Sequence, residues 1–306
     1  MENWNNLKNN PDIQEYIKFW QENDIKIFYT DDFPWMKYQG ILQPAILFGP
    51  YELPKYTDQQ MQVLLKNSKA PLARWSNNFQ NQETEWWWIV CRPPFSIDLL
   101  SHKARNQTKK SLSQCVIKII SPQELIKAGY DCYLSSCQTH KKISFLTRPQ
   151  WEKFINSHLK YHCFDFWGIF IKNKLVGYAK CVKIDKKIDL SAIWYNPDFK
   201  EYYPIYALIY TLLDHYLNQQ QCQYVANGMR SIAHDTKMQE FLETKFNFEK
   251  EYCRLNVFYS PIFNSFIKII YPFGNILNIV SKIIRVSIFR KIIVILKQEK
   301  IRKSFL

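Results

Sequence analysis

The sequence predicts a mixed α/β fold in which helices flank a sheet that includes parallel strands. The order strand, helix, strand, helix in residues 188–252 carries this prediction, because parallel neighbours need a helical crossover. Hydrophobic residues make up 47% of the chain and aromatic residues 16%, which indicates a large packed core. At 306 residues the chain exceeds what one core usually serves, so two domains or two closely packed halves are expected.

Residues 188–196 are typical of a strand, and they end at a turn signal in 196–198. A helix is predicted next from Pro204, a residue that suits the first helical position. A second apolar strand ends at Gly228, and the capping residues at 235 and 236 start another helix. We therefore expect functional groups where these two strands end.

The segment from 121 to 261 extends this sheet. A capping box at 121–124 starts the first of two helices, and the second covers residues 147–161. Residues 164–184 are typical of a β-hairpin, and a final strand is predicted over 250–259. The order is then two helices, a hairpin, a third strand, a helix, a strand, a helix and a last strand.

Residues 1–120 are predicted to form a mixed α/β unit of their own, with an amphipathic helix at 11–23. Its most unusual feature is the run Trp86, Trp87 and Trp88. Alternating strand faces would bury part of this run in the core, while a lipid or sugar pocket is the functional alternative. The eight cysteines lack a CxxC pair, and none is expected to act as a nucleophile.

The element order from residue 121 resembles the GNAT acyltransferase fold. Two segments are similar to its Fem-type branch, the peptidoglycan aminoacyl transferases, which pack two GNAT-like units together. These segments are DLLSHKARNQTKKSLSQCVIKII at 98–120 and MQEFLETKFNFEKEYCRLNVFYSP at 238–261. The resemblance implies an N-terminal GNAT-like unit at 1–120 and a C-terminal GNAT-like acyltransferase unit at 121–260. A basic helical tail follows at 261–306.

The resemblance also implies an acyl donor, either acyl-CoA or aminoacyl-tRNA, held where two central strands splay apart. The family's glycine-rich coenzyme A loop is replaced here by NPDFKEYYPIY at 196–206. A helix N-terminus near Tyr203 remains available to an anion. Glu243 stands where many GNAT enzymes place a general-acid tyrosine, so that role is not transferred. No metal is expected.

Acyl transfer to an amine needs a base, a positioned electrophile and donors for the developing oxyanion. The ends of the two parallel strands supply such groups. The predicted catalytic residues are His234, Asn227 and Tyr195, and the predicted substrate-binding residues there are Trp194, Asn196 and Arg230. The structural alternative is a loop whose polar residues merely cap the next helix.

Arg105, Lys109 and Lys110 share one side of a predicted helix and complete the expected substrate-binding set as an anion site. A solvated basic helix surface is the alternative. His158 and His162 are four residues apart, a spacing that suits a metal, but without a third ligand they are expected to be ordinary histidines.

Residues 261–306 contain nine basic residues and one acidic residue, a net charge of +8 out of +14. This segment is predicted to be an amphipathic helix that binds an anionic membrane or packs on the protein itself. The leading hypothesis is a cytoplasmic acyltransferase at the membrane's inner face, acting on an amine of a cell-envelope or polysaccharide precursor. The rival hypothesis is a non-enzymatic GNAT-like module that binds membrane or nucleic acid through this tail.

Overall fold

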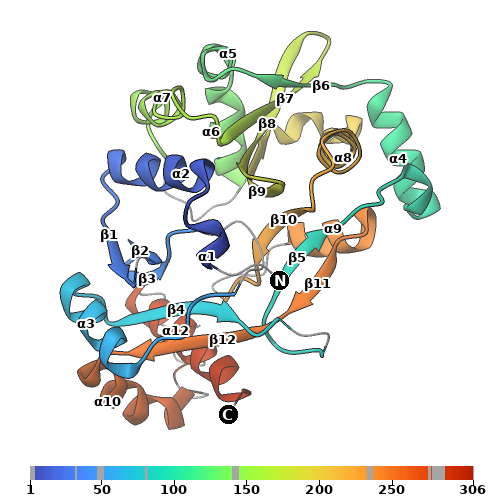
Figure 1. The fold of residues 1–306 in the computed structure, drawn as a ribbon. Helices are drawn as coiled ribbons and strands as arrows, with labels where there is room; N and C mark the ends of the chain where they lie inside the picture. Colours follow the sequence, from blue (N-terminus) through green and yellow to red (C-terminus); the bar gives the residue numbers. More distant parts are fainter. Residues whose placement is uncertain are drawn as a thin grey trace.

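Two β-sheets form the frame of the molecule, and helices pack on both (Figure 1). The computed structural model describes residues 4–31, 33–46, 52–79, 82–139, 145–232, 237–274, 277 and 287–305. Each sheet contains one parallel strand pair among antiparallel ones. The predicted fold class, a mixed sheet flanked by helices, is confirmed.

The larger sheet has seven strands and carries most of the predicted elements. In order across the sheet they are β11 (Glu249–Tyr252), β5 (Trp87–Cys91), β10 (Tyr224–Met229), β9 (Lys187–Tyr195), β8 (Lys174–Ile184), β7 (Phe164–Ile171) and β6 (Val116–Ile120). The predicted hairpin is confirmed as the antiparallel pair of β7 and β8. The predicted parallel pair is confirmed as β9 and β10.

Helices cover both faces of this sheet (Figure 1). On one face lie α4 (His102–Leu112), α8 (Pro204–Leu213) and α9 (Lys237–Phe246); on the other lie α5 (Pro122–Ala128), α6 (Tyr130–Thr139) and α7 (Arg148–Asn156). The predicted capping box at α5 is present, because the Glu124 amide donates to Ser121 Oγ and the Ser121 amide donates to Glu124 Oε2. Gly129 then separates α5 from α6.

The smaller sheet is built mostly from the first part of the chain. Its strands, in order, are β1 (Ile27–Thr30), β2 (Phe33–Tyr38), β3 (Ile41–Pro44), β4 (Leu72–Asn77) and β12 (Arg254–Tyr259). The helices of this region are α1 (Trp4–Leu7), α2 (Pro11–Glu22) and α3 (Asp58–Ser68). The amphipathic helix predicted at 11–23 is α2, whose apolar face packs against both sheets.

The two sheets exchange strands, so neither is made from one continuous half of the chain. Strands β5 and β6 precede residue 121 but belong to the seven-stranded sheet, and β12 returns to the five-stranded sheet. The predicted single strand at 250–259 is therefore wrong. It is split at Cys253, which is buried beside Trp86 and whose amide donates to the Trp86 carbonyl. β11 and β12 on either side join different sheets.

The tryptophan run alternates as strand geometry requires. Trp86 and Trp88 are buried, and Trp86 Nε1 donates to Ser76 Oγ at 2.9 Å. Trp87 is half-buried between two cations, with Arg230 4.7 Å and Lys250 5.0 Å from its ring centroid. The core-packing interpretation is thus confirmed for Trp86 and Trp88.

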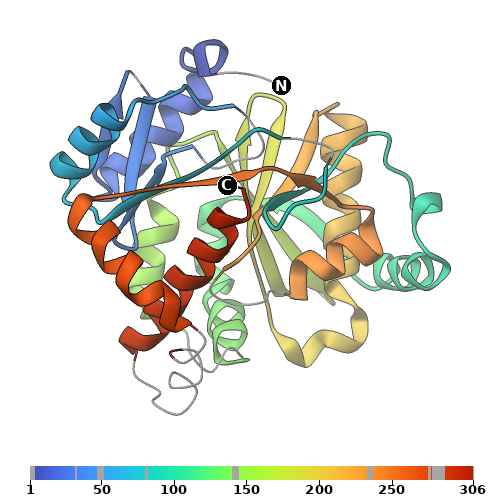
Figure 2. The same ribbon diagram turned by 90° about the horizontal axis from the view of Figure 1, so that it is seen from below.

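The predicted C-terminal helical segment is present as α10 (Pro261–Ile270) and α12 (Ser287–Lys303), which lie against the five-stranded sheet (Figure 2). A buried acidic residue joins α12 to β12. Glu299 accepts a hydrogen bond from Tyr259 Oη at 2.9 Å and two from the Arg302 guanidinium at 2.8 Å. Within the described ranges, no helix is long and apolar enough to cross a bilayer.

Replacing Glu299 with Ala should lower the free energy of unfolding by about 2 kcal/mol at pH 7, because Tyr259 and Arg302 would lose a buried acceptor. Burial raises the pKa of Glu299, but the bonds from Arg302 and Tyr259 outweigh it and hold that pKa below its ordinary value. This stabilisation is therefore lost as pH falls through the folded-state pKa. Urea unfolding at pH 7 and pH 3 measures both effects.

Lys300→Ala is the matched control, because Lys300 is an exposed neighbour on the same helix. It should change the free energy of unfolding by less than about 0.5 kcal/mol. Equal effects of the two substitutions at pH 7 would contradict the stabilising role of Glu299.

Candidate active site

The parallel strands β9 and β10 part in the middle of the seven-stranded sheet. Residues 187–189 of β9 pair with residues 224–226 of β10, and beyond Asp189 the described residues of β9 have no register partner in β10. Both strands are irregular at this point. Ser191 is an extra residue in the ladder between β8 and β9, and the register between β10 and β5 shifts after Ala226. Such bulges bend a strand and re-aim its side chains.

Side chains and turned backbone replace the missing ladder bonds at the parting. Asn227 Nδ2 donates to the Leu190 carbonyl at 2.8 Å. Gly228 has a φ of +73°, a conformation that glycine adopts without strain, and its amide donates to the Asp189 carboxylate. Gln239 Nε2 from α9 donates to the carbonyls of Asn227 and Met229 at 3.2 and 3.0 Å. These hydrogen bonds hold the two strands apart at this point.

Asp189 is the acidic group at this gap, and it is 8% exposed. Burial raises its pKa from the ordinary 3.8 to about 6, although hydrogen bonds from Ser191 and Gly228 and the charge of Lys180 favour the ionised form. Ser191 Oγ donates to Asp189 Oδ2 at 2.7 Å, and Ser191 itself is exposed. A carboxylate poised to take up a proton near neutral pH is thus connected to solvent through one hydroxyl.

Lys180 is the basic group of the same face. It lies on β8 two residues from Val182, the register partner of Asp189, so both side chains are on one side of the sheet. Burial lowers the pKa of Lys180 to about 8, and the Asp189 charge partly opposes this. Its ammonium lies 5.4 Å from the Phe154 ring and 5.7 Å from the Phe164 ring. The Lys180 ammonium therefore lies next to two aromatic rings.

The residues predicted at the end of β9 point in different directions. Trp194 faces α6 and α7 and stacks on Tyr178, with ring centroids 4.9 Å apart. Tyr195 pairs with Gly177 and points to the opposite face. Asn196 caps the following turn, since its Oδ1 accepts from the Asp198 amide at 3.0 Å. Of these three, only Trp194 shares a face with Asp189.

The residues predicted after β10 are also separated. Arg230 is tied to the segment before β5, because it donates to the Glu85 carbonyl, pairs with the Glu85 carboxylate at 3.5 Å and lies over Trp87. Asn227 is the predicted residue that lies at the parting itself. His234 lies outside the described residues, as do the capping residues Asp235 and Thr236.

The three cations of α4 do not make common contacts. Arg105 donates to the carbonyls of Asp98 and Leu100 at the start of α4. At the other end, Lys110 lies 5.2 Å from the Tyr203 ring centroid, and Ser111 Oγ donates to the Tyr203 carbonyl at 2.8 Å. Lys110 thus lies beside the first turn of α8, and Lys109 precedes it on α4.

His158 is a core residue. It is 1% exposed, its ring lies 4.5 Å from that of Phe19, and burial lowers its pKa to about 3. In the parts of the chain that the structure describes, no three His, Cys, Asp or Glu side chains gather as a metal site would require.

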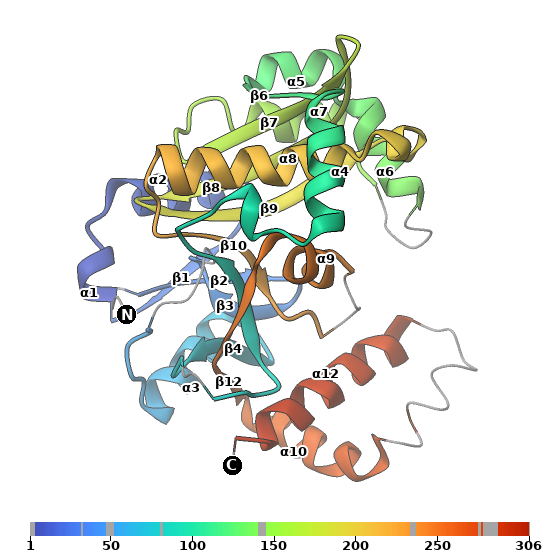
Figure 3. The ribbon, with the colours of Figure 1, turned by 90° about the vertical axis from the view of Figure 1, so that its right-hand side faces the viewer.

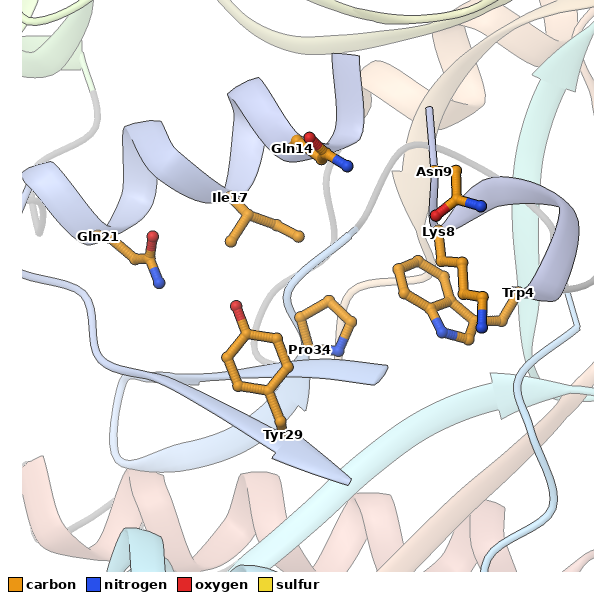
Figure 4. A pocket seen from close by; sticks show the side chains of 8 residues that line it. All are labelled: Trp4, Lys8, Asn9, Gln14, Ile17, Gln21, Tyr29 and Pro34. Atoms are coloured by element: carbon orange, nitrogen blue, oxygen red, sulfur yellow. The ribbon is translucent and has the colours of Figure 1, made fainter. Parts of the chain in front are cut away.

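A cavity of about 410 Å³ lies in the five-stranded half, between α1, α2, β1 and β2 (Figure 4). Its lining is Trp4, Lys8, Asn9, Gln14, Ile17, Gln21, Tyr29 and Pro34. Side-chain amides and aromatic rings dominate this surface, and it includes none of the predicted site residues. The cavity is separate from the acid and base groups at the strand parting.

No protein-family model and no curated protein sequence matches this chain. Among solved structures, FemX superposes with a TM-score of 0.55 at 7% identity, over 86% of this chain and 96% of FemX. The chain has the GNAT-type fold of FemX. A GCN5-related N-acetyltransferase from Kribbella flavida gives a TM-score of 0.44 at 7% identity, over 81% of this chain and 92% of that protein. At such identities the likeness concerns the fold alone.

The sequence prediction missed the residues that the structure brings together at the strand parting, Asp189, Ser191 and Lys180. Asp189 and Ser191 are two residues apart in a strand, so they fall on the same face and interrupt its apolar pattern. A charged residue within an apolar predicted strand could have indicated this site, because such residues are rarely buried without a reason. Lys180 in the predicted hairpin is a second example.

Replacing Asp189 with Asn should raise the free energy of unfolding at pH 8 and leave it unchanged at pH 4. The folded-state pKa of about 6 exceeds the ordinary 3.8, so the folded protein binds an extra proton between these values and stability falls as pH rises through them. At pH 8 the ionised carboxylate costs the fold about 3 kcal/mol, which the neutral amide avoids. Urea unfolding at both pH values measures the difference.

Asp198→Asn serves as the control, because Asp198 is exposed in the turn after β9. It should alter stability little at either pH. An Asp189→Asn protein that is no more stable than the parent at pH 8 would contradict the assigned burial of the charge.

Proposed function

We propose that the protein is an N-acyltransferase whose reaction takes place at the parting of β9 and β10, with Asp189 as the general base. The observation that carries this proposal is a buried carboxylate with a pKa of about 6 at the open point of a FemX-type sheet. A base with a pKa near the working pH is largely deprotonated and still binds a proton strongly enough to accept one from the substrate.

The acceptor amine would lie against Ser191, the exposed member of the pair. As its nitrogen attacks the donor's carbonyl carbon, the amine proton passes to Ser191 Oγ while the Ser191 proton moves to Asp189 Oδ2, along the 2.7 Å hydrogen bond. Collapse of the intermediate breaks the bond from the carbonyl carbon to the donor's sulfur or oxygen. That leaving group then takes the proton from Asp189 through the same hydroxyl. The chain itself forms no covalent bond.

The donor would enter along the β9 edge that faces β10. This edge lacks a strand partner beyond Asp189, so an extended amide-bearing group could pair with its backbone. An anionic end of the donor would reach the first turn of α8, where the helix dipole and Lys110 both favour negative charge. Acyl-CoA and aminoacyl-tRNA both carry phosphates and both fit this arrangement. The observed contacts favour Lys110 over Arg105 for this role.

The acceptor class remains the one predicted from the sequence, an amine on a cell-envelope or polysaccharide precursor. The FemX fold supports it only as a likeness of architecture. The rival function, a non-catalytic binding module, is favoured by one observation. Asn227 satisfies the Leu190 carbonyl that a donor would otherwise use, in a chain without the glycine-rich loop.

Catalysed transfer should depend on pH through Asp189. The value of kcat/KM should rise as pH increases through about 6 and level off above it, because the base acts only when deprotonated. Asp189→Asn should lower kcat/KM at least about 100-fold at pH 7.5 and leave donor affinity unchanged. Ser191→Ala should have a smaller effect, about 10-fold, because a water molecule can replace the hydroxyl.

The assay pairs each donor, acetyl-CoA or aminoacyl-tRNA, with small primary amines and follows amide formation by mass spectrometry. Asp198→Asn, with its exposed carboxylate, should retain full activity. Donor binding without any transfer, unaffected by Asp189→Asn at every pH, would support the binding module instead.

A further inference from the structure

Helix α10 and the turn after it expose a row of large apolar side chains. Ile262 is 87% exposed, Phe266 41%, Ile269 67% and Phe273 55%. Their spacings of four, three and four residues place them in one line along the helix. Isolated exposed apolar residues are ordinary, but four in a continuous row form a surface suited to contact. These four residues are called the α10 row below.

The opposite side of α10 is already packed, so the row is not an unfinished core. Ile267 is 2% exposed and contacts Leu72 of β4 and Tyr259 of β12. Phe263 and Ile270 lie in the same cluster. The helix is thus held by one face to the five-stranded sheet, and it presents the other face outward. Figure 3 shows α10 and α12 side by side at one end of the molecule, and Ile301 of α12 also packs with Trp88 of β5 and Tyr224 of β10.

Exposed positive charge accompanies the α10 row on α10 and α12. Lys268 is exposed on α10 itself, and Lys303 Nζ lies 3.8 Å from the centroid of the Tyr271 ring, beside the C-terminal end of the row. Lys291, Lys297 and Lys300 of α12 are also exposed. The one acidic residue of segment 261–306 is Glu299, which is buried and bound to Arg302.

We propose that the α10 row docks the protein on an anionic lipid bilayer, with α10 lying in the plane of the interface. The apolar side chains would enter the acyl boundary, and the lysines would remain at the lipid phosphates. A helix that lies on the surface agrees with the lack of a membrane-spanning helix in the described residues. This inference does not rest on the proposed acyl transfer, because no residue of the row is part of the site around Asp189.

Charge decides between a bilayer and the other occupants of such a surface. In a symmetric dimer built on the α10 row, Lys268 and Lys303 of one copy would approach the same cations of the other copy. Nucleic acid would match the lysines, but its phosphate backbone would not use Ile262, Phe266, Ile269 or Phe273. An anionic bilayer matches both the apolar row and its cationic margin.

The test is flotation of the purified full-length chain with vesicles. The protein should float with vesicles of 70% phosphatidylcholine and 30% phosphatidylglycerol at low salt, and at least about 10-fold more weakly with pure phosphatidylcholine. The double substitution Ile262→Asp and Ile269→Asp should lower the partition coefficient at least about 10-fold. Lys268→Gln should lower it about 3-fold and weaken its dependence on salt.

Val63→Asp is the matched control, because Val63 is 52% exposed on α3, outside this surface. It should float as the parent does. Thermal melting confirms that each variant is folded, which is expected because the replaced side chains are exposed. Amide formation with soluble donor and amine should be unchanged in the double variant, so a failure here is separable from a failure of the proposed activity.

Three results would overturn the proposal. The first is a parent protein that does not float with anionic vesicles, and the second is a double variant that floats as well as the parent. The third is a parent that is dimeric by light scattering, becomes monomeric in the double variant and does not bind vesicles, which would assign the α10 row to a second copy of the chain.

Discussion

The parting of β9 and β10 is the constraint on which the site depends. Two parallel strands that stayed paired would close the sheet over Asp189. The ladder instead stops after Asp189 and Ala226, and polar groups satisfy what it leaves open: the Asn227 side chain bonds the Leu190 carbonyl, and the Gly228 amide bonds the Asp189 carboxylate. Because these groups come from the strands themselves, the opening is part of the folded state and requires no ligand to hold it.

The same burial that makes ionised Asp189 costly to the fold would suit it to act as the base in the proposed reaction. A solvated carboxylate would be too weak a base near neutral pH, and a buried one without partners would remain protonated. Ser191, Gly228 and Lys180 place it between these limits, at a pKa of about 6. If Asp189 is the base, the free energy that its buried charge costs the fold is the price of its raised pKa, as is common at active sites.

Local signals in the sequence were sufficient to predict the elements but not their long-range partners. Pro204 and the apolar strands on either side predicted the parallel pair, and the capping box at 121–124 predicted α5, because each signal acts within a few residues. The insertion of β5 beside β10 and the break at Cys253 depend on contacts between distant segments, which no local pattern encodes. The position of Arg230 could not be predicted for the same reason, since its partners Glu85 and Trp87 are more than 100 residues earlier in the sequence. Asp189 was missed although its place in an apolar strand was visible.

At the parting of β9 and β10, burial raises the pKa of the Asp189 carboxylate. The titration of Asp189 tests this most directly. Carbon-13 NMR of side-chain carboxyl groups, with Asp189→Asn to identify the signal, follows that titration without any assumption about substrate. The structure predicts a midpoint at about pH 6. A midpoint near the ordinary 3.8 would show that the group is solvated, and would contradict the site described here.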